Sequence, residues 1–273
     1  MRAYMLALAL PLVVLTACST SSLTSTEECP SEPPSLLGRN CVPDSKDREA
    51  LPNTAARYGT RSMEEYAARR DACRRAIDEE FIRLFVVCSP CRGDRDCAVT
   101  GALQLGWVEL TKNADPQVAM RRFNQAWLIN PNDVRVYWAF GVAYEGMLDD
   151  DKAHEMLNEA VQLNARSHQL PDLELARLYG DFGYALLRAG QREGTPERSQ
   201  VHLEEACRYF QKSTETHEDS RTCRYAQWAT ALFLLGEYQE TWRKVHLSES
   251  RDQKYCPRLP LDELRKAMPE PSQ

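Results

Sequence analysis

The sequence predicts an all-α protein, in which an amino-terminal arm without regular structure precedes a stack of helical hairpins. Three observations support this fold class. Apolar residues recur with a helical period from Ser62 onward. Segments after residue 100 resemble one another when the chain is shifted by 34 residues. Clusters of Pro, Asn and Asp interrupt the apolar pattern where hairpins would turn.

Composition indicates a foldable chain and excludes one class of partner. Of the 273 residues, 43% are hydrophobic and 27% are charged, which is ordinary for a globular protein. The net charge is −6, and no basic run offsets it. Because affinity for nucleic acid depends on clustered Lys and Arg, we expect no nucleic-acid partner.

The first residues are typical of an export signal. Met1 and Arg2 are followed by residues 3–15, which are apolar apart from Tyr4 and Pro11. This stretch is too short to cross about 30 Å of hydrocarbon as a mature span. It therefore predicts a cleaved signal peptide over residues 1–17.

Leu15-Thr16-Ala17-Cys18 resembles the lipobox of bacterial lipoproteins. The resemblance implies that Cys18 carries diacylglycerol and palmitate and anchors the protein in the lipid bilayer. The alternative is an ordinary secretory signal with a coincidental cysteine. Because Ser19 replaces the aspartate that retains such proteins at the inner membrane, the resemblance implies the outer membrane of the cell envelope, facing the periplasm.

Residues 18–60 are expected to form a flexible tether, because this segment is rich in Ser, Thr, Pro and Glu and has no sustained apolar period. A cysteine-rich helical cap is expected over residues 61–99. Ser62 and Glu65 have capping-box spacing, and the pattern that follows predicts one long helix over residues 62–87.

Cysteine content predicts disulfides. The chain has ten cysteines, and acylation of Cys18 would leave nine, so at least one would be unpaired or paired with another chain. Export to an oxidising compartment favours disulfides for the rest. The candidates are Cys73, Cys88, Cys91, Cys97, Cys207, Cys223 and Cys256.

The sequence Cys88-Ser89-Pro90-Cys91 permits two alternatives. One is a zinc site, which lacks the usual second CxxC pair. The other is a thiol–disulfide exchange site, which lacks a βαβ pattern to present it. Cys88 also follows the end of a predicted apolar helix, where the helix dipole disfavours a thiolate.

The internal repeat is clearest between the first two units. A shift of 34 residues aligns Leu103 with Tyr137, Trp107 with Gly141, and Phe123 with Leu157. A period of this length with alternating large and small residues is typical of a helix–turn–helix solenoid.

This pattern resembles the tetratricopeptide (TPR) family. Residues 134–167 match it best, residues 100–133 match it except that Trp107 occupies a small position, and residues 176–213 and 222–255 form two further units. The resemblance implies a superhelix of stacked α-hairpins, because each hairpin needs a neighbour to bury its apolar face. The matching positions of the second unit are Tyr137, Phe140, Gly141, Tyr144, Ala153, Leu157 and Ala160.

Turn residues agree with these boundaries. Asp115 with Pro116 predicts a helix start, residues 130–133 (Asn-Pro-Asn-Asp) predict a turn and a cap, and residues 149–151 (three Asp) predict another start. Four extra residues fall within 190–198 and predict a loop there. The tail, residues 256–273, has a short helical segment at 261–268.

No motif for catalysis or cofactor binding stands out. The five histidines are scattered, and the chain has no HExxH, G-x-S-x-G, P-loop or G-x-G-x-x-G sequence. We therefore expect neither an enzyme, nor a metal site, nor a cofactor.

Resemblance to the TPR family implies that first-helix residues line an inner surface that binds protein. Trp138, which lies between Arg135 and Glu145, is the most suggestive residue of this stripe, because Trp and Arg often carry interface energy. Further residues on the stripe are Val108, Thr111, Val142, Leu187 and Thr230. Alternatively, Trp138 and Tyr184 only pack against a neighbouring helix or the amino-terminal cap. The stripe's candidate binding residues are Gln104, Arg135, Trp138, Glu145, Arg177, Tyr184 and Phe233.

These observations favour a membrane-anchored adaptor or assembly factor that binds another envelope protein or a peptide segment. The alternative function is a periplasmic thiol–disulfide oxidoreductase that uses Cys88 and Cys91.

Overall fold

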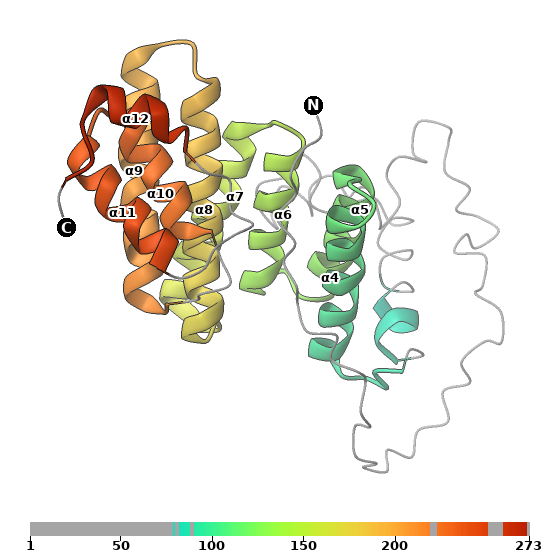
Figure 1. Cartoon of the computed structure of the whole chain (residues 1–273). Helices are drawn as coiled ribbons and strands as arrows, with labels where there is room; N and C mark the ends of the chain where they lie inside the picture. The colour runs from blue at the N-terminus through green and yellow to red at the C-terminus, as the bar shows by residue number, and fades with distance from the viewer. Residues whose placement is uncertain (1–78, 80–81, 88–89, 219–222, 251–258, 272–273) are drawn as a thin grey trace. The chain divides into compact units, whose positions relative to one another are not determined.

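The computed structural model describes residues 79, 82–87, 90–218, 223–250 and 259–271, and these residues form helices without any strand (Figure 1). The prediction of an all-α protein is confirmed. The chain divides into two compact units, residues 1–132 and residues 133–273.

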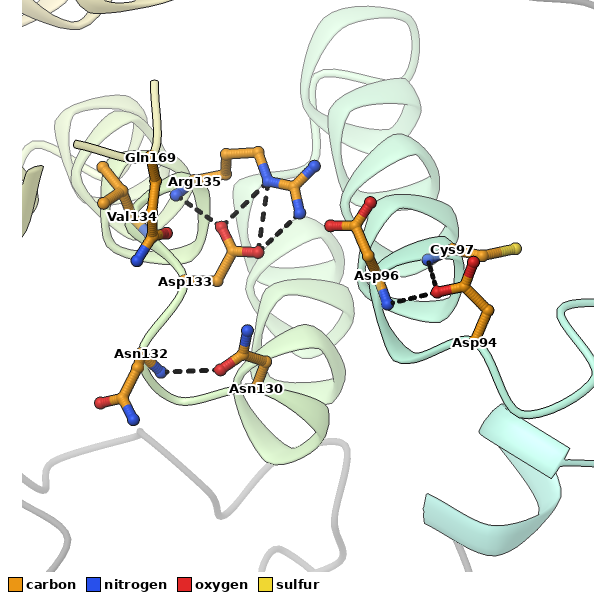
Figure 2. A network of polar contacts seen from close by, with 9 residues as sticks. All are labelled: Asp94, Asp96, Cys97, Asn130, Asn132, Asp133, Val134, Arg135 and Gln169. Carbon is orange, nitrogen blue, oxygen red and sulfur yellow. Dashed lines mark hydrogen bonds and ion pairs between the residues drawn. The ribbon is translucent and has the colours of Figure 1, made fainter. Parts of the chain in front are cut away.

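The described part of the first unit contains the π-helical segment Arg83–Val87 and one helical hairpin. Helix α4 (Arg95–Thr111) is capped by Asp94, whose side chain accepts hydrogen bonds from the backbone N–H groups of Asp96 and Cys97 (Figure 2). Helix α5 (Pro116–Ile129) begins as predicted, with Asp115 as its cap and proline in its first turn.

A glycine lets α4 and α5 approach closely, but at a different position from the one that the repeat alignment predicted. A Cβ atom on Gly106 would overlap the ring of Phe123, which is fully buried. The ring of Trp107 instead packs edge-on against Phe123, with centroids 5.4 Å apart. Gly106, and not Trp107, is therefore the small residue at which α4 and α5 approach closely, because the Trp107 ring packs edge-on against the Phe123 ring.

The described part of the second unit consists of three hairpins and a terminal helix. Within each hairpin the two helices pack together, and successive hairpins contact one another through α7 with α8 and α9 with α10. The first helices of the hairpins also touch in sequence, α6 with α8 and α8 with α10. The helices are α6 (Val134–Gly146), α7 (Asp150–Ser167), α8 (Asp172–Arg192), α9 (Pro196–Thr216), α10 (Arg224–Leu234), α11 (Tyr238–Ser250) and α12 (Leu261–Ala267).

Predicted turn residues cap the helices. Asn130 accepts a hydrogen bond from the N–H of Asn132, and Asp133 caps α6 by accepting from the N–H of Arg135 at 2.9 Å (Figure 2). Asp149 caps α7 in the same way, with the N–H of Lys152. These local signals predicted the starts of α6 and α7 correctly.

Residues 190–198 do not form the predicted loop. Helices α8 and α9 are each 21 residues long, and only residues 193–195 connect them. The additional residues extend the helices by about one turn. Gly190 does not end α8, because it sits against Leu203 of α9, where a Cβ atom would lie 3.0 Å from Cγ.

Glycines and large apolar residues form the core of the second unit. A Cβ on Gly141 would overlap Leu157, and a Cβ on Gly183 would lie 2.9 Å from the ring of Phe210. Without these methyl groups, each first helix lies close to its second helix, as ridge-and-groove packing requires. The side chains that this packing buries almost completely include Phe140, Leu157, Leu178, Phe182, Leu186 and Phe210.

The tail packs back onto the last hairpin. Helix α12 occupies most of the segment predicted to be helical at 261–268, and Leu264 is fully buried. The indole N–H of Trp242 in α11 donates a hydrogen bond to the carbonyl of Met268 at 3.1 Å. The tail therefore covers an apolar part of α11.

The described cysteines partly follow the prediction. Cys91 forms a disulfide with Cys97, and Cys223 is also disulfide-bonded. Cys207 is a free thiol, so the disulfide considered for it is corrected. Its position in the middle of α9, against Trp228, accounts for this.

Several predictions concern residues outside the described ones. These are the signal peptide, Cys18, the tether, Cys73, Cys88, Cys256 and most of the helix over residues 62–87. Of that helix, Arg83–Val87 is described, and it is π-helical rather than α-helical. Among the described residues, no helix combines the length and apolarity needed to cross a membrane.

Candidate functional site

Helices α6, α8 and α10 carry a group of polar side chains between them. We call this group the first-helix network. Its residues are contributed by the first helices of three successive hairpins and by the first turn of α7. They are Trp138, Glu145, Asp150, Arg177, Asp181, Tyr184, Arg188, Arg192 and Arg224.

Trp138 connects α6 to α8. Its indole N–H donates a hydrogen bond to Oδ2 of Asp181 at 2.9 Å. Burial raises the pKa of Asp181, while the charges of Arg224 and Arg177 and the Trp138 hydrogen bond oppose that rise. Trp138 and Tyr184 also pack against the apolar core. Both aromatic residues therefore have a packing role, and Trp138 has a polar contact as well.

Arg224 connects α10 to α8. This residue is only 4% exposed, and its guanidinium lies over the backbone of Gly180, where any Cβ atom would overlap it. A buried guanidinium needs anionic or hydrogen-bonding partners, and Asp181 supplies a nearby negative charge. The missing side chain at Gly180 therefore leaves room for the Arg224 guanidinium close to the carboxylate of Asp181.

A second cluster lies at the carboxyl end of α8. Oε1 of Glu145 lies 3.9 Å from Nε of Arg188 and 4.0 Å from Nη1 of Arg192. Arg192 also binds Asp150, with its Nε donating to Oδ2 at 3.0 Å. Burial raises the pKa of Glu145, and the two arginines oppose that rise. Burial is the main cause of the raised pKa of Tyr184, and the negative charge of Glu145 raises it further.

Two further predicted residues of the second unit, Arg135 and Phe233, do not take part in these clusters. Arg135 forms an ion pair with Asp133, its own helix cap, at 2.6 Å. Phe233 packs against Tyr238 and the core of α10, α11 and α12, so it does not join the network. Gln104 is exposed on α4 in the first unit.

Sequence reasoning missed Asp181, Arg188, Arg192 and Arg224. One signal was available, because Gly180 occupies a stripe position where the TPR family usually presents a side chain. A missing side chain at such a position indicates that another group approaches the backbone there. Arg188 and Arg192 follow Tyr184 at helical spacing, which also places them on its stripe.

Another polar cluster joins α9, α10 and α11. Nζ of Lys244 lies 3.5 Å from the centroid of the Trp228 ring. Burial raises the pKa of the Cys207 thiol to about 11 and lowers the pKa of Lys244. The thiol is therefore protonated at neutral pH and is a poor nucleophile.

Chemically, the first-helix network offers recognition groups. It presents guanidinium and phenol groups at its surface, and the side chain of Arg188 is 42% exposed. The described residues contain no cluster of three or more His, Cys, Asp or Glu that could hold a metal ion. No protein-family model, curated protein or solved structure matches this chain.

Proposed function

We propose that this protein is a lipid-anchored adaptor or assembly factor of the bacterial cell envelope, built as a TPR-like superhelix. Its first helices would bind a segment of another envelope protein. The anchor would be the acylated Cys18, and residues 18–60 would give the helical body reach from the membrane.

One observation carries this proposal. The first helices α6, α8 and α10 contact one another in order, and they present a partly exposed polar face next to their buried core. In a solenoid of hairpins, such a continuous face is where a partner binds. Arg and aromatic residues on it are the types that most often carry interface energy.

The alternative, a thiol–disulfide oxidoreductase, requires Cys88 and Cys91 to exchange electrons as a pair. Cys91 is instead joined to Cys97, six residues away. Burial raises the pKa of the free Cys207 thiol, which opposes reactivity there. We therefore do not favour this function.

Site-specific photocrosslinking in living cells tests the proposal. A crosslinking amino acid would replace Arg177 or Val142 on the first-helix face, or the exposed Gln162 and Gln200 on the second helices α7 and α9 as controls. We expect one defined partner from the first-helix positions and no such product from the controls. Equal products from both sets would contradict the proposed binding face.

The anchor is tested in the same cells. A Cys18→Ala variant should not incorporate a labelled fatty acid and should leave the membrane fraction, because several acyl chains are needed for stable attachment. Unchanged membrane association of this variant would show that the anchor lies elsewhere.

A further inference from the structure

Two guanidinium nitrogens at the carboxyl end of α8 have unsatisfied hydrogen-bonding capacity. Nε of Arg188 and Nη1 of Arg192 are inaccessible to solvent, and neither donates a hydrogen bond in the described structure. Buried polar atoms are rarely left without a partner, so such atoms point to a group that binds there. The two residues lie one helical turn apart on α8.

Their nearest internal carboxylate does not satisfy them. Glu145 lies 3.9 and 4.0 Å from the two nitrogens, which is beyond hydrogen-bonding distance. Asp150 already accepts from the other nitrogens of Arg192. Arg188 has no other ion pair in the described structure, since Glu145 is its one acidic neighbour within 4 Å.

The longer α8 creates this arrangement. Arg188 and Arg192 lie in the last turns of the helix, and Arg192 is its final residue. Cations are stabilised at a helix carboxyl end, which favours two arginines at this position. Tyr184, one turn earlier on the same stripe, places its hydroxyl group in the same electrostatic environment as Glu145 and both arginines.

We propose that Tyr184, Arg188 and Arg192 bind a carboxylate of an acidic segment in the partner protein. The incoming carboxylate takes over the role that Glu145 fills poorly, accepting hydrogen bonds from the planar guanidinium of Arg188. The partly exposed side chain of Arg188 gives the ligand access. This inference rests on the proposed adaptor function and names the chemistry of the segment that is bound.

Charge complementarity selects an acidic segment over a basic one. Asp150 neutralises Arg192, and Glu145 is shared between two arginines at long range, so Arg188 is the least compensated charge of the cluster. A basic segment would meet two guanidinium groups at this position and would be repelled.

The test measures binding of labelled peptides to the mature protein in detergent by fluorescence anisotropy. Three probes share the same leucine positions and differ only in alternate residues, which are Asp, Asn or Lys. We expect the Asp peptide to bind most tightly, and Arg188→Gln to weaken it by about tenfold or more while leaving the Asn peptide unchanged. Glu145→Gln should strengthen binding of the Asp peptide, because it removes the competing carboxylate.

Arg198→Gln is the matched control. Arg198 belongs to α9, its side chain is 72% exposed, and its nearest acid is Glu193 at 3.9 Å. An equal loss from Arg198→Gln and Arg188→Gln would overturn the proposal, as would equal affinity for the three peptides. If Arg188→Gln fails to fold, Arg188→Lys retains the charge but lacks the planar fork, and it should still bind the Asp peptide less tightly than the unmodified protein.

Failure of the two proposals can be distinguished. If crosslinking at position 177 captures a partner while the peptides show no preference for Asp, the adaptor function stands and the acidic ligand is wrong. If the Asp peptide binds but crosslinking finds no partner in cells, the site exists and the adaptor function is wrong.

Discussion

The hairpins α4–α5 and α8–α9 share a packing principle but differ in their surfaces. In both, a glycine of the first helix meets a phenylalanine of the second: Gly106 meets Phe123, and Gly183 meets Phe210. The exposed face of α4 includes the apolar Leu105 and Val108. By contrast, α8 carries Arg177, Asp181, Tyr184, Arg188 and Arg192 of the first-helix network.

This comparison shows that the core and the face of a hairpin are determined separately. The glycine–phenylalanine contact sets how closely two helices approach, and it tolerates almost any sequence on the opposite face. A disulfide ties Cys97, in the first turn of α4, to Cys91, whereas α8 is joined to α6 by the hydrogen bond between Trp138 and Asp181.

The largest effect is expected from filling the glycine contact of the first hairpin. Gly106→Ala should destabilise the protein by about 2 to 3 kcal/mol, because the added methyl group overlaps the buried Phe123 ring. Gly183→Ala should cost less, since its Cβ would lie 2.9 Å from Phe210. Urea denaturation measures both.

Gly101 provides the matched control on the same helix, because a Cβ there meets nothing within 4 Å. Gly101→Ala should be neutral or stabilise the helix by about 0.5 to 1 kcal/mol. Equal destabilisation by Gly101→Ala and Gly106→Ala would show that helix packing is not the cause.

The next effect concerns the disulfide beside the first hairpin. Replacing both Cys91 and Cys97 by Ser should cost about 2 kcal/mol, because the short loop that they close becomes free in the unfolded chain. Hydrogen exchange should increase in α4 and α5 and should stay unchanged in α8 and α9. A uniform increase throughout both units would contradict this local role.

A smaller effect is expected from Gly180→Ala in α8. The added methyl group must displace the guanidinium of Arg224, with an expected cost of about 1 to 2 kcal/mol, and exchange should increase where α8 meets α10. Gly194→Ala, in the connection between α8 and α9, is the control because a Cβ there is in open space. Equal melting temperatures of the two variants would show that the position of Arg224 does not depend on Gly180.

The smallest effect is a pH dependence from Glu145. Burial raises its pKa in the folded protein, so between the ordinary value of 4.5 and the raised value the folded state binds more protons than the unfolded state. The contribution of Glu145 to stability is therefore full below pH 4.5 and is lost as the pH rises through the raised pKa.

Glu145→Gln should remove this dependence, and the stability difference between variant and parent should favour the variant increasingly as the pH rises above 4.5. Thermal melting of both proteins across this pH range measures the difference. A constant difference would mean that burial of Glu145 does not alter its protonation.

Local features of the sequence determined the helix starts and the helical class. Asp115 with Pro116, the Asn130–Asp133 turn and Asp149 each cap a helix through bonds to residues two or three positions away. Such bonds depend only on neighbouring residues, so they can be predicted without knowing the fold.

Tertiary structure alone decided which groups meet across helices. The choice of Gly106 over Trp107 and the placement of Arg224 over Gly180 both depend on where distant elements approach. The contact of Glu145 with Arg192 arose because α8 continues into a stretch predicted to be a loop. Rotation of a helix by one residue turns its side chains by about 100°, and only packing against its neighbours sets that rotation.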